Sequence, residues 1–353
     1  MSTRFRLHLE NGRLRNELFH LTHEQWAQAA ARHPELAKQV DVSVGWDGDI
    51  LEKALQDADA LIAGPIDRPK IIQASKLKWI HTTGAGVDHL LPLDWLPEQI
   101  TVTNSSGIHG DKTEDFISMA LLMLHNKMPQ ILANQTKQIW DMIHEFNIRG
   151  KTATVIGFGD VGRAAGLGAK RLGMKVIAVT RSGVAQPLAD ETISVSQLDS
   201  VLPRTDYLIV AAPLTADTRG LVTDARIASL PKGAGLINIG RSPIVDYTAV
   251  IKHLASKQLD GAILDVFDKE PLEPGSPLWT TPNLIVTPHI SCDAPDYVQR
   301  VLDCWFANFG GLDKYISDKN IFKQYLKGYS VRAVLADAKG VLWAGTDAGL
   351  FQY

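Results

Sequence analysis

Short apolar runs recur along the chain, and segments with apolar residues at helical spacing lie between them. In the first third of the sequence, five segments have the length of strands, and the first of them alternates apolar and polar residues. They are residues 5–9, 40–44, 58–63, 77–81 and 100–103. Strands that alternate with helices, such as the helix expected over residues 24–33, are typical of a parallel sheet covered by helices. The pattern therefore predicts an α/β domain in this part of the chain.

A second series of apolar runs begins at Thr152 and predicts a second parallel sheet. Its members are residues 152–156, 175–179, 206–211, 233–239, 261–266 and 283–286. Between the two series, residues 113–138 have helical periodicity, and Phe116, Met119 and Met123 lie on the expected apolar face. A helix of this length can connect two domains.

Three glycines follow the strand expected over residues 152–156. Gly157, Gly159 and Gly162 have the spacing G-x-G-x-x-G and precede a segment with helical periodicity. The first glycine permits a tight turn, the second lets a pyrophosphate approach the backbone, and the third lets helix and strand pack closely. Free N–H groups at the helix start favour the phosphates. This context predicts a dinucleotide site; the alternative is an ordinary α/β crossover rich in glycine.

The end of the next expected strand bears on the choice of dinucleotide. Folds that prefer NAD place a carboxylate about 20 residues beyond the glycines, where it binds the ribose 2′-OH. This chain has Thr180, Arg181 and Ser182 there. A guanidinium and two hydroxyls suit a 2′-phosphate, so NADP(H) is the preferred cofactor and NAD(H) the alternative. An ordinary solvated arginine at a strand end would have the same sequence.

Candidate catalytic residues follow the ends of the later expected strands. Ligands bind beyond the carboxyl ends of strands in an open parallel sheet, and Arg241, Asp265, Glu270 and His289 all fall there. A histidine titrates near neutral pH and can exchange the proton that accompanies hydride transfer. Glu270 can fix the tautomer of His289, and Arg241 can bind a carboxylate. Taken singly, each has a structural alternative: a surface histidine or a solvated Glu-Pro turn.

Composition narrows the class of protein. The length of 353 residues is typical of two domains, and the net charge of -3 gives no indication of nucleic-acid or membrane binding. Ile117–Leu124 is too short to cross a bilayer, and the N-terminus lacks the apolar core of a signal peptide. Two cysteines, Cys292 and Cys304, do not make a disulfide framework, so we expect a cytoplasmic protein. No residue is predicted to bind a metal.

Five segments of the chain resemble the D-isomer-specific 2-hydroxyacid dehydrogenase family. They are GFGDVG at 157–162, APLTADTRGLV at 212–222, INIGRSPIVD at 237–246, AILDVFDKEPL at 262–272 and NLIVTPHIS at 283–291. The resemblance implies two Rossmann-like or flavodoxin-like parallel-sheet domains with a cleft between them. It assigns residues 121–292 to the NAD(P)-binding domain and residues 1–120 with 293–329 to the substrate-binding domain. It also implies a homodimer formed through the cofactor domains.

The same resemblance implies a role for each candidate residue. Arg241 would bind the α-keto carboxylate, His289 would act as acid-base, and Glu270 would lie behind His289. The backbone N–H groups of Ala85 and Gly86 would also bind the carboxylate. The implied cofactor-binding residues are Gly157, Gly159, Asp160, Val161, Gly162, Thr180, Arg181, Ser182, Ala212, Pro213, Ile239 and Asp265.

Departures from the family pattern refine the expected activity. The family usually has Asp at the position of Thr180, so this chain is more similar to the NADP(H)-using glyoxylate and hydroxypyruvate reductases. Formate dehydrogenases have Gln at the position of Glu270, which makes formate an unfavourable substrate. Too few residues follow the matched region for the regulatory domain of many phosphoglycerate dehydrogenases. The alternative class is a binding protein that senses NAD(P)H, as transcriptional corepressors of this family do.

The last segment departs from the family. Residues 331–353 resemble one repeat of the β-propellers found in sensor kinases, with Leu342-Trp343 in a strand and Gly-Thr-Asp-x-Gly-Leu after it. A single repeat has no neighbour against which to bury its faces. We therefore interpret residues 330–353 as a fusion scar or chimeric tail, and a natural strand pair that binds a partner is the alternative.

Overall fold

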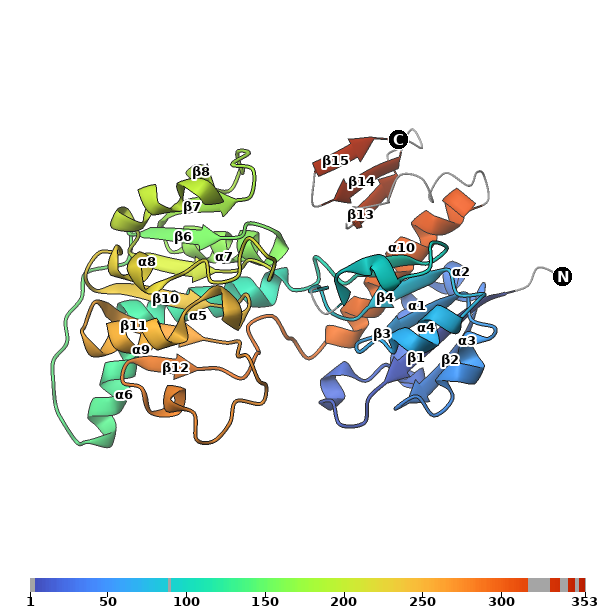
Figure 1. Ribbon diagram of the computed structural model, residues 1–353, viewed down its shortest axis with the longest axis horizontal. Helices are drawn as coiled ribbons and strands as arrows, with labels where there is room; N and C mark the ends of the chain where they lie inside the picture. Colours follow the sequence, from blue (N-terminus) through green and yellow to red (C-terminus); the bar gives the residue numbers. More distant parts are fainter. Residues whose placement is uncertain (1–3, 88–89, 317–330, 337–341, 347–348, 353) are drawn as a thin grey trace. The chain divides into compact units, whose positions relative to one another are not determined.

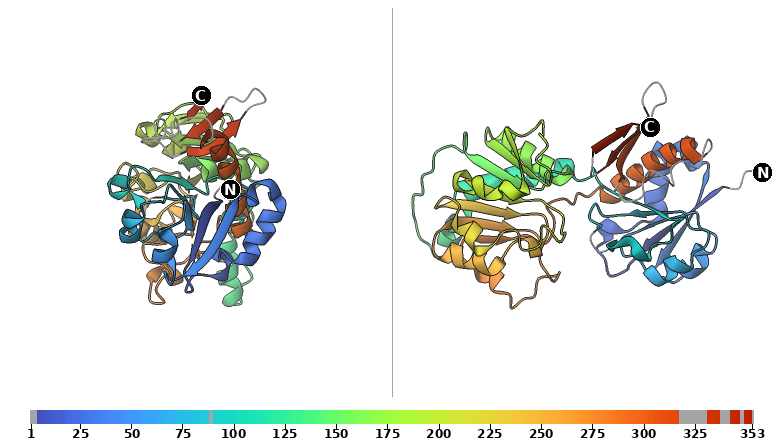
Figure 2. Two further views of the ribbon diagram at one scale, coloured as in Figure 1. Left: turned by 90° about the vertical axis from the view of Figure 1, so that its right-hand side faces the viewer. Right: turned by 45° about the horizontal axis from the view of Figure 1, so that its top comes forward.

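The computed structural model describes residues 4–87, 90–316, 331–336, 342–346 and 349–352. The chain divides into two compact units (Figure 1): unit 1 comprises residues 1–108 and 295–353, and unit 2 comprises residues 109–294. Each unit contains its own parallel sheet with helices packed on it (Figure 2). The predicted fold class of two parallel-sheet α/β domains is confirmed.

The sheet of unit 1 has five parallel strands in the order β2-β1-β3-β4-β5. The strands are β1 Phe5–Asn11, β2 Val40–Trp46, β3 Ala60–Ala63, β4 Trp79–Thr82 and β5 Thr101–Asn104. The chain leaves β1 toward β2 on one side and then crosses to β3 on the other side of β1. The order of the strands therefore reverses between β1 and β3, which is the place where open α/β sheets bind ligands.

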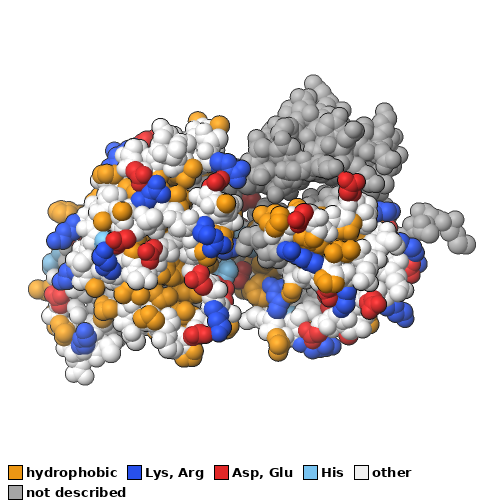
Figure 3. All heavy atoms as spheres, viewed as in Figure 1, with side chains coloured by type: hydrophobic (Ala, Val, Ile, Leu, Met, Phe, Trp, Pro, Cys, Tyr) orange, Lys and Arg blue, Asp and Glu red, His pale blue; other side chains and the backbone are white. Residues whose placement is uncertain are grey.

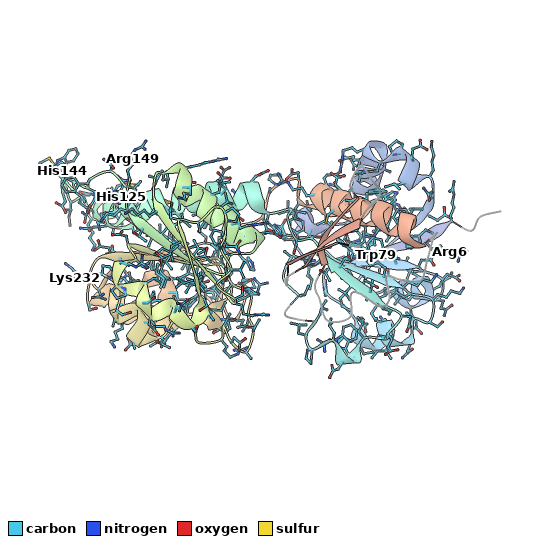
Figure 4. The ribbon with its side chains drawn as sticks, turned by 90° about the horizontal axis from the view of Figure 1, so that it is seen from above. Arg6, Trp79, His125, His144, Arg149 and Lys232 are labelled. Carbon is cyan, nitrogen blue, oxygen red and sulfur yellow. The ribbon has the colours of Figure 1, made fainter. Side chains whose placement is uncertain are left out.

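Aromatic side chains fill one face of this sheet. Trp79 of β4, labelled in Figure 4, stacks on Trp305 with ring centroids 5.2 Å apart, and Trp305 stacks on Phe309 at 4.9 Å. Both partners belong to α10, which brings the C-terminal part of the chain back to unit 1. The helices of the unit are η1 Glu17–Phe19, α1 His23–Arg32, α2 Pro34–Ala37, α3 Leu51–Leu55, α4 Arg68–Gln73, η3 Leu93–Trp95 and α10 Tyr297–Ile316.

The sheet of unit 2 has seven parallel strands in the order β12-β11-β10-β9-β6-β7-β8. They are β6 Thr152–Ile156, β7 Lys175–Thr180, β8 Glu191–Ser194, β9 Tyr207–Val210, β10 Ala234–Asn238, β11 Leu259–Leu264 and β12 Leu284–Val286. The strand order reverses between β6 and β9. β9 and β10, in the middle of the sheet, are fully buried, and β6 is buried after Thr152, as their apolar runs predicted.

Helices cover both faces of this second sheet (Figure 2). They are α5 Gly110–His125, α6 Met128–Thr136, α7 Asp160–Arg171, η4 Val195–Ser200, η5 Leu202–Arg204, α8 Asp224–Ala228, η6 Ser242–Ile244, α9 Tyr247–Ala255 and η7 Pro277–Thr280. The prediction of one helix over residues 113–138 was wrong, because Lys127 has a left-handed backbone with φ 54° between α5 and α6. Met119 was expected on the apolar face but is 45% exposed, because the buried stripe of α5 follows Ile117, Leu121 and Leu124.

The C-terminal strands form a small sheet of their own. β13 Val331–Ala336, β14 Leu342–Thr346 and β15 Gly349–Gln352 pair in antiparallel fashion in chain order. The turn residues expected between the first two strands lie outside the described residues.

Charged side chains of both signs are interspersed on the visible face of each unit (Figure 3). In the part of the chain that the structure describes, no helix is long and apolar enough to cross a membrane. The described residues also contain no group of three or more His, Cys, Asp or Glu side chains arranged to hold a metal ion.

Candidate active site

Two of the three motif glycines are required by close backbone approach. Gly157 has φ 84°, and a Cβ atom built on it would lie 2.5 Å from Cα of Ala212. A Cβ built on Gly162 would lie 1.8 Å from the carbonyl oxygen of Gly157. The turn after β6 can therefore form only with glycine at these two positions.

The start of α7 is available to an anion. Gly159 is the N-cap of α7 and provides no side chain to hydrogen-bond the first amides of this helix. The one acidic side chain of the first turn, Asp160, is paired with Arg163 at 3.0 Å, which offsets its charge. Uncapped amides at a helix start, next to a turn without side chains, fit the pyrophosphate of a dinucleotide.

The segment after β7 lies beside this turn. Ile156 and Val179 are partners in the sheet, and the N–H of Gly157 donates to the carbonyl of Val179 at 2.9 Å. Thr180 accepts a hydrogen bond from the N–H of Gly183 at 2.9 Å. Arg181 is exposed, and among the described residues no carboxylate pairs with it. Its guanidinium is available to an anionic group of a ligand.

Other predicted cofactor residues line the neighbouring strand ends. The backbone of Ala212 lies against Gly157, and a Cβ on Gly240 would lie 2.8 Å from the carbonyl oxygen of Ala212. Pro213 follows Ala212, and its carbonyl accepts from Thr218 at 2.7 Å. The N–H of Ile239 donates to Val210, while Val161 packs against the apolar core under α7. The structure thus brings the glycine turn and the ends of β9 and β10 together.

His289 and Glu270 form a hydrogen-bonded pair beyond the ends of β11 and β12. Nδ1 of His289 lies 2.8 Å from Oε2 of Glu270, and Oε1 of Glu270 accepts from the N–H of Phe267 at 2.9 Å. The hydrogen bond that His289 donates to Glu270 raises the pKa of His289 against the opposing effect of burial. Burial acts to raise the pKa of Glu270, but the bonds from His289 and Phe267 outweigh it and lower that pKa. Among the described residues, Nε2 of His289 has no partner.

Asp265 positions the loop that carries His289. Its buried carboxylate accepts hydrogen bonds from Thr287 Oγ1 at 2.6 Å and from the N–H groups of Ile290 at 2.9 Å and Ser291 at 3.0 Å. These contacts bracket His289, whose backbone has φ 56°, a conformation that is uncommon for residues other than glycine. Asp265 therefore holds the loop on both sides of His289, a role that the sequence did not indicate.

Arg241 follows β10 and is fixed by its own strand end. Asn238 accepts from the N–H of Gly240 at 3.0 Å and donates to the carbonyl of Arg241 at 3.2 Å. Asn238 also donates to the hydroxyl of Tyr247 at 2.9 Å, which in turn donates to the carbonyl of Val266 at 2.7 Å. The positive charge of Arg241 acts on the pKa of both Glu270 and His289. Sequence reasoning missed Asn238 and Tyr247, although Asn238 is a polar residue at the end of a buried strand.

The loop predicted to bind a carboxylate belongs to unit 1. The carbonyl of Gly84 accepts from the N–H of Ser105 at 3.3 Å and from Thr82 Oγ1 at 3.0 Å, and the carbonyl of Ala85 accepts from Asn104 at 2.6 Å. In a trans peptide the C=O and the following N–H point in opposite directions. Because both carbonyls are directed toward the end of β5, the N–H groups of Ala85 and Gly86 point away from it.

Comparisons with known proteins place the chain in a family. A profile of the D-isomer specific 2-hydroxyacid dehydrogenase NAD binding domain matches residues 118–291, and a profile of the catalytic domain of the same family matches residues 21–184. A putative 2-hydroxyacid dehydrogenase of Haemophilus influenzae is 32% identical over 254 residues, which cover 67% of this chain and 78% of that protein. The chain belongs to the D-isomer specific 2-hydroxyacid dehydrogenase family, whose members are NAD(P)-dependent oxidoreductases.

Two solved structures are similar over most of the chain. A D-isomer specific 2-hydroxyacid dehydrogenase of Xanthobacter autotrophicus, in complex with NADPH, has a TM-score of 0.76 and 27% identity, covering 89% of this chain and 96% of that one. An NADPH-dependent glyoxylate/hydroxypyruvate reductase of Sinorhizobium meliloti, in complex with NADP and sulfate, has a TM-score of 0.70 and 26% identity, covering 89% and 94%. The predicted oxidoreductase class is confirmed.

Proposed function

We propose that this protein is an NADP(H)-preferring reductase that interconverts a small 2-keto acid, such as glyoxylate or hydroxypyruvate, and the D-2-hydroxy acid. The observation that carries the proposal is the pair formed by His289 and Glu270 at 2.8 Å. Glu270 occupies Nδ1, while Nε2 has no partner among the described residues and the side chain is 46% exposed. The imidazole is therefore fixed on one side and available to a substrate on the other.

The chain's residues divide the chemistry between them. A bound NADPH would supply the hydride. His289 in its protonated form would donate a proton from Nε2 to the carbonyl oxygen, and Glu270 would stabilise the imidazolium through Nδ1. Arg241 would bind the carboxylate of the keto acid and polarise the adjacent carbonyl. The N–H groups of Ala85 and Gly86 would bind the same carboxylate.

The preference for NADP(H) rests on the segment after β7. Arg181 is exposed and has no carboxylate partner among the described residues, and residues 181–189, which directly follow β7, include no acidic side chain to repel a 2′-phosphate. Thr180 and Ser182 flank Arg181 with hydroxyl groups. The structures from Xanthobacter autotrophicus and Sinorhizobium meliloti contain NADPH and NADP, which agrees with this preference. The remaining cofactor contacts would come from the glycine turn and from residues 212, 213, 239 and 265.

We assign residues 121–292 to cofactor binding and residues 1–120 with 293–329 to substrate binding. The match of the NAD binding domain profile to residues 118–291 supports the first assignment. We place the protein in the cytoplasm on the strength of its composition. For residues 330–353 we keep the interpretation of a single propeller-like repeat appended to the enzyme, which the antiparallel pairing of β13, β14 and β15 supports.

We propose that the protein forms a homodimer through unit 2, because the connection between α6 and β6 exposes large apolar side chains. Trp140 is 93% exposed and Phe146 is 90% exposed, with Ile139 and Met142 beside them in the chain. His125, labelled in Figure 4, anchors this connection by a 2.6 Å contact between Nε2 and the carbonyl of Phe146. An anchored apolar segment of this kind is typical of a protein–protein interface.

The experiment that tests the proposed function is a panel of 2-keto acids assayed with NADPH and with NADH. We expect turnover of glyoxylate or hydroxypyruvate, faster with NADPH. Binding of NADPH without turnover of any keto acid would instead favour the sensing role of the corepressor-like members. Light scattering of the same sample tests the dimer, and a monomer at assay concentration would contradict that part of the proposal.

A further inference from the structure

Arg15 lies across two glycines at the carboxyl edge of the unit 1 sheet. Gly12 directly follows β1, and a Cβ built on it would lie 3.6 Å from Cγ of Arg15. Gly64 directly follows β3, and a Cβ built on it would lie 2.0 Å from Nη1 and 3.0 Å from Cζ of Arg15. The aliphatic part of the Arg15 side chain thus lies over Gly12, and its guanidinium lies over Gly64. The side chain of any larger residue at position 64 would take the place of this guanidinium.

This position is the switch point of the sheet. The two glycines follow the neighbouring strands β1 and β3, between which the strand order reverses. Open α/β sheets bind ligands in the crevice beyond this point. Thr83, which follows β4 and precedes the Gly84-Ala85-Gly86 loop, places Oγ1 3.2 Å from the same built Cβ position on Gly64. The guanidinium, the Thr83 hydroxyl and the start of the loop therefore share one small region.

The charge of Arg15 is held in place but is not neutralised by the described part of unit 1. Its Cζ lies 4.8 Å from the centroid of the Phe19 ring, and its carbonyl accepts from Nε2 of His20 at 3.0 Å. The neighbouring Arg13 pairs with Asp47 at 2.8 Å, whereas no described carboxylate pairs with Arg15. The Arg15 guanidinium is positioned by an aromatic ring and has no acidic partner among the described residues. Its N–H groups are therefore suited to bind an acceptor group of a ligand.

We propose that Arg15 is a specificity-determining residue that binds an oxygen-bearing group of the substrate beyond the keto carbon. This inference rests on the proposed function, in which Arg241, Ala85 and Gly86 bind the carboxylate. A second cation at the switch point of unit 1 then selects 2-keto acids with an acceptor at C3 or C4 over those with an alkyl group there. The acceptor is either a hydroxyl, as in hydroxypyruvate, or a second carboxylate, as in oxaloacetate.

The test compares matched substrates in the variant Arg15→Met, which keeps an unbranched apolar stem of similar length and removes the charged fork. Hydroxypyruvate is compared with pyruvate, and oxaloacetate with 2-ketobutyrate, all with NADPH at saturation. We expect kcat/KM of Arg15→Met to fall about 10- to 150-fold on the oxygen-bearing member of the preferred pair, the range for loss of a hydrogen bond to a charged group. For the substrate with the alkyl group, kcat/KM should change by no more than about threefold. The substrate pair in which only the oxygen-bearing member loses kcat/KM identifies the acceptor group.

Two further variants separate recognition from structure. Arg13→Met removes a neighbouring arginine whose side chain is 58% exposed and paired with Asp47. This variant should leave the ratio of kcat/KM values within each substrate pair unchanged. Gly64→Ala adds a Cβ where the guanidinium lies, so it should displace Arg15 and lower the same ratio. In the Arg15→Met background Gly64→Ala should have no further effect, because the two changes act through one contact.

The outcomes distinguish this inference from the function on which it rests. Equal losses on both members of each pair in Arg15→Met would overturn the role of Arg15 while leaving the reductase intact. Additive effects of Gly64→Ala and Arg15→Met would also contradict it. If the wild-type protein reduces no 2-keto acid at all, the proposed function is wrong and the inference fails with it.

Discussion

The carboxyl edges of the two sheets have the same architecture but use glycine in opposite ways. In unit 2, the glycines bring backbone against backbone, since a Cβ on Gly162 would lie 1.8 Å from the carbonyl oxygen of Gly157. In unit 1, the atoms closest to a Cβ built on Gly12 or Gly64 belong to the side chain of Arg15. One edge therefore exposes amides to a ligand, and the other makes room for a guanidinium.

This difference predicts how each edge tolerates substitution. A clash with backbone must be relieved by moving the turn itself, whereas a clash with the far end of an arginine is relieved by a new rotamer. We therefore expect the edge of unit 2 to be rigid, so that a substitution there either leaves the turn intact or disrupts it completely. The edge of unit 1 is expected to be adjustable, so that changes there alter the choice of substrate more than the fold.

The largest effect is expected from Gly162→Ala. The added methyl group cannot coexist with the carbonyl of Gly157, so we expect unfolding free energy to fall by about 3 kcal/mol or more and NADPH binding to be lost. Each kcal/mol corresponds to a drop in Tm of roughly 2–4 °C for a domain of this size. Gly64→Ala is the matched control and should cost about 1 kcal/mol or less. Similar losses of Tm in the two variants would refute the contrast between the edges.

The next largest effect is expected from His289→Ala, which removes the proposed acid-base group of unit 2. We expect kcat to fall by about a hundredfold or more, because general acid-base catalysis typically contributes that much. NADPH binding, measured by fluorescence titration, should be unchanged, since the glycine turn is not altered. Turnover like that of the wild type would exclude His289 as the proton donor.

Exchange of the cofactor segment should have an intermediate effect. A charge-assisted contact between Arg181 and a 2′-phosphate typically contributes about 1.5–3 kcal/mol, so NADPH should be favoured over NADH by about 10- to 150-fold in kcat/KM. Thr180→Asp combined with Arg181→Ala should reverse the preference. The preference of the wild type should also shrink as salt rises, because Arg181 is exposed. Equal use of NADH by the wild type would show that this segment does not select the cofactor.

A smaller effect is expected from Glu270→Gln on the pH dependence of reduction. Glu270 raises the pKa of His289, so the protonated form needed for reduction persists to higher pH and activity is lost as pH rises through the raised pKa. The variant should therefore lose activity at lower pH than the wild type does. The stability contributed by the raised pKa has the same sign, since it is present at low pH and lost as pH rises. An unchanged falling limb would contradict the coupling of the pair.

Removal of residues 330–353 should have the smallest effect. A single propeller-like repeat has no neighbouring repeats with which to share a core, so activity and Tm should remain close to those of the full chain. Calorimetry and the NADPH assay on the shortened protein provide the check. A large loss of Tm would instead indicate that the tail stabilises the enzyme.

The sequence predicted unit 2 more completely than unit 1, for local physical reasons. Thr152–Ile156 is a β-branched run followed directly by glycines, and the strand has those limits in the structure. β8 was not expected, because Glu191–Ser194 is a short, polar edge strand without an apolar run. The break between α5 and α6 was also missed, since only tertiary context requires the left-handed backbone of Lys127.

The candidate site divides in the same way. Arg241, Glu270 and His289 follow strand ends at positions that sequence spacing can identify, and neighbouring strands then bring them to one edge. Arg15 could not be identified from spacing, because the glycines it covers are Gly12 and Gly64, which belong to different strand ends. The contacts of Asp265 with Thr287 and Ser291 were hidden for the same reason, since they join the ends of two separate strands.

The central claim is that unit 2 selects the cofactor while unit 1 selects among acids, and one kinetic matrix tests it. The measurement is kcat/KM for hydroxypyruvate and pyruvate, each with NADPH and NADH, in the wild type, in Thr180→Asp with Arg181→Ala, and in Arg15→Met. We predict that the first variant changes only the cofactor ratio and the second changes only the acid ratio. If either variant shifts both ratios by similar factors, the division between the two units is wrong.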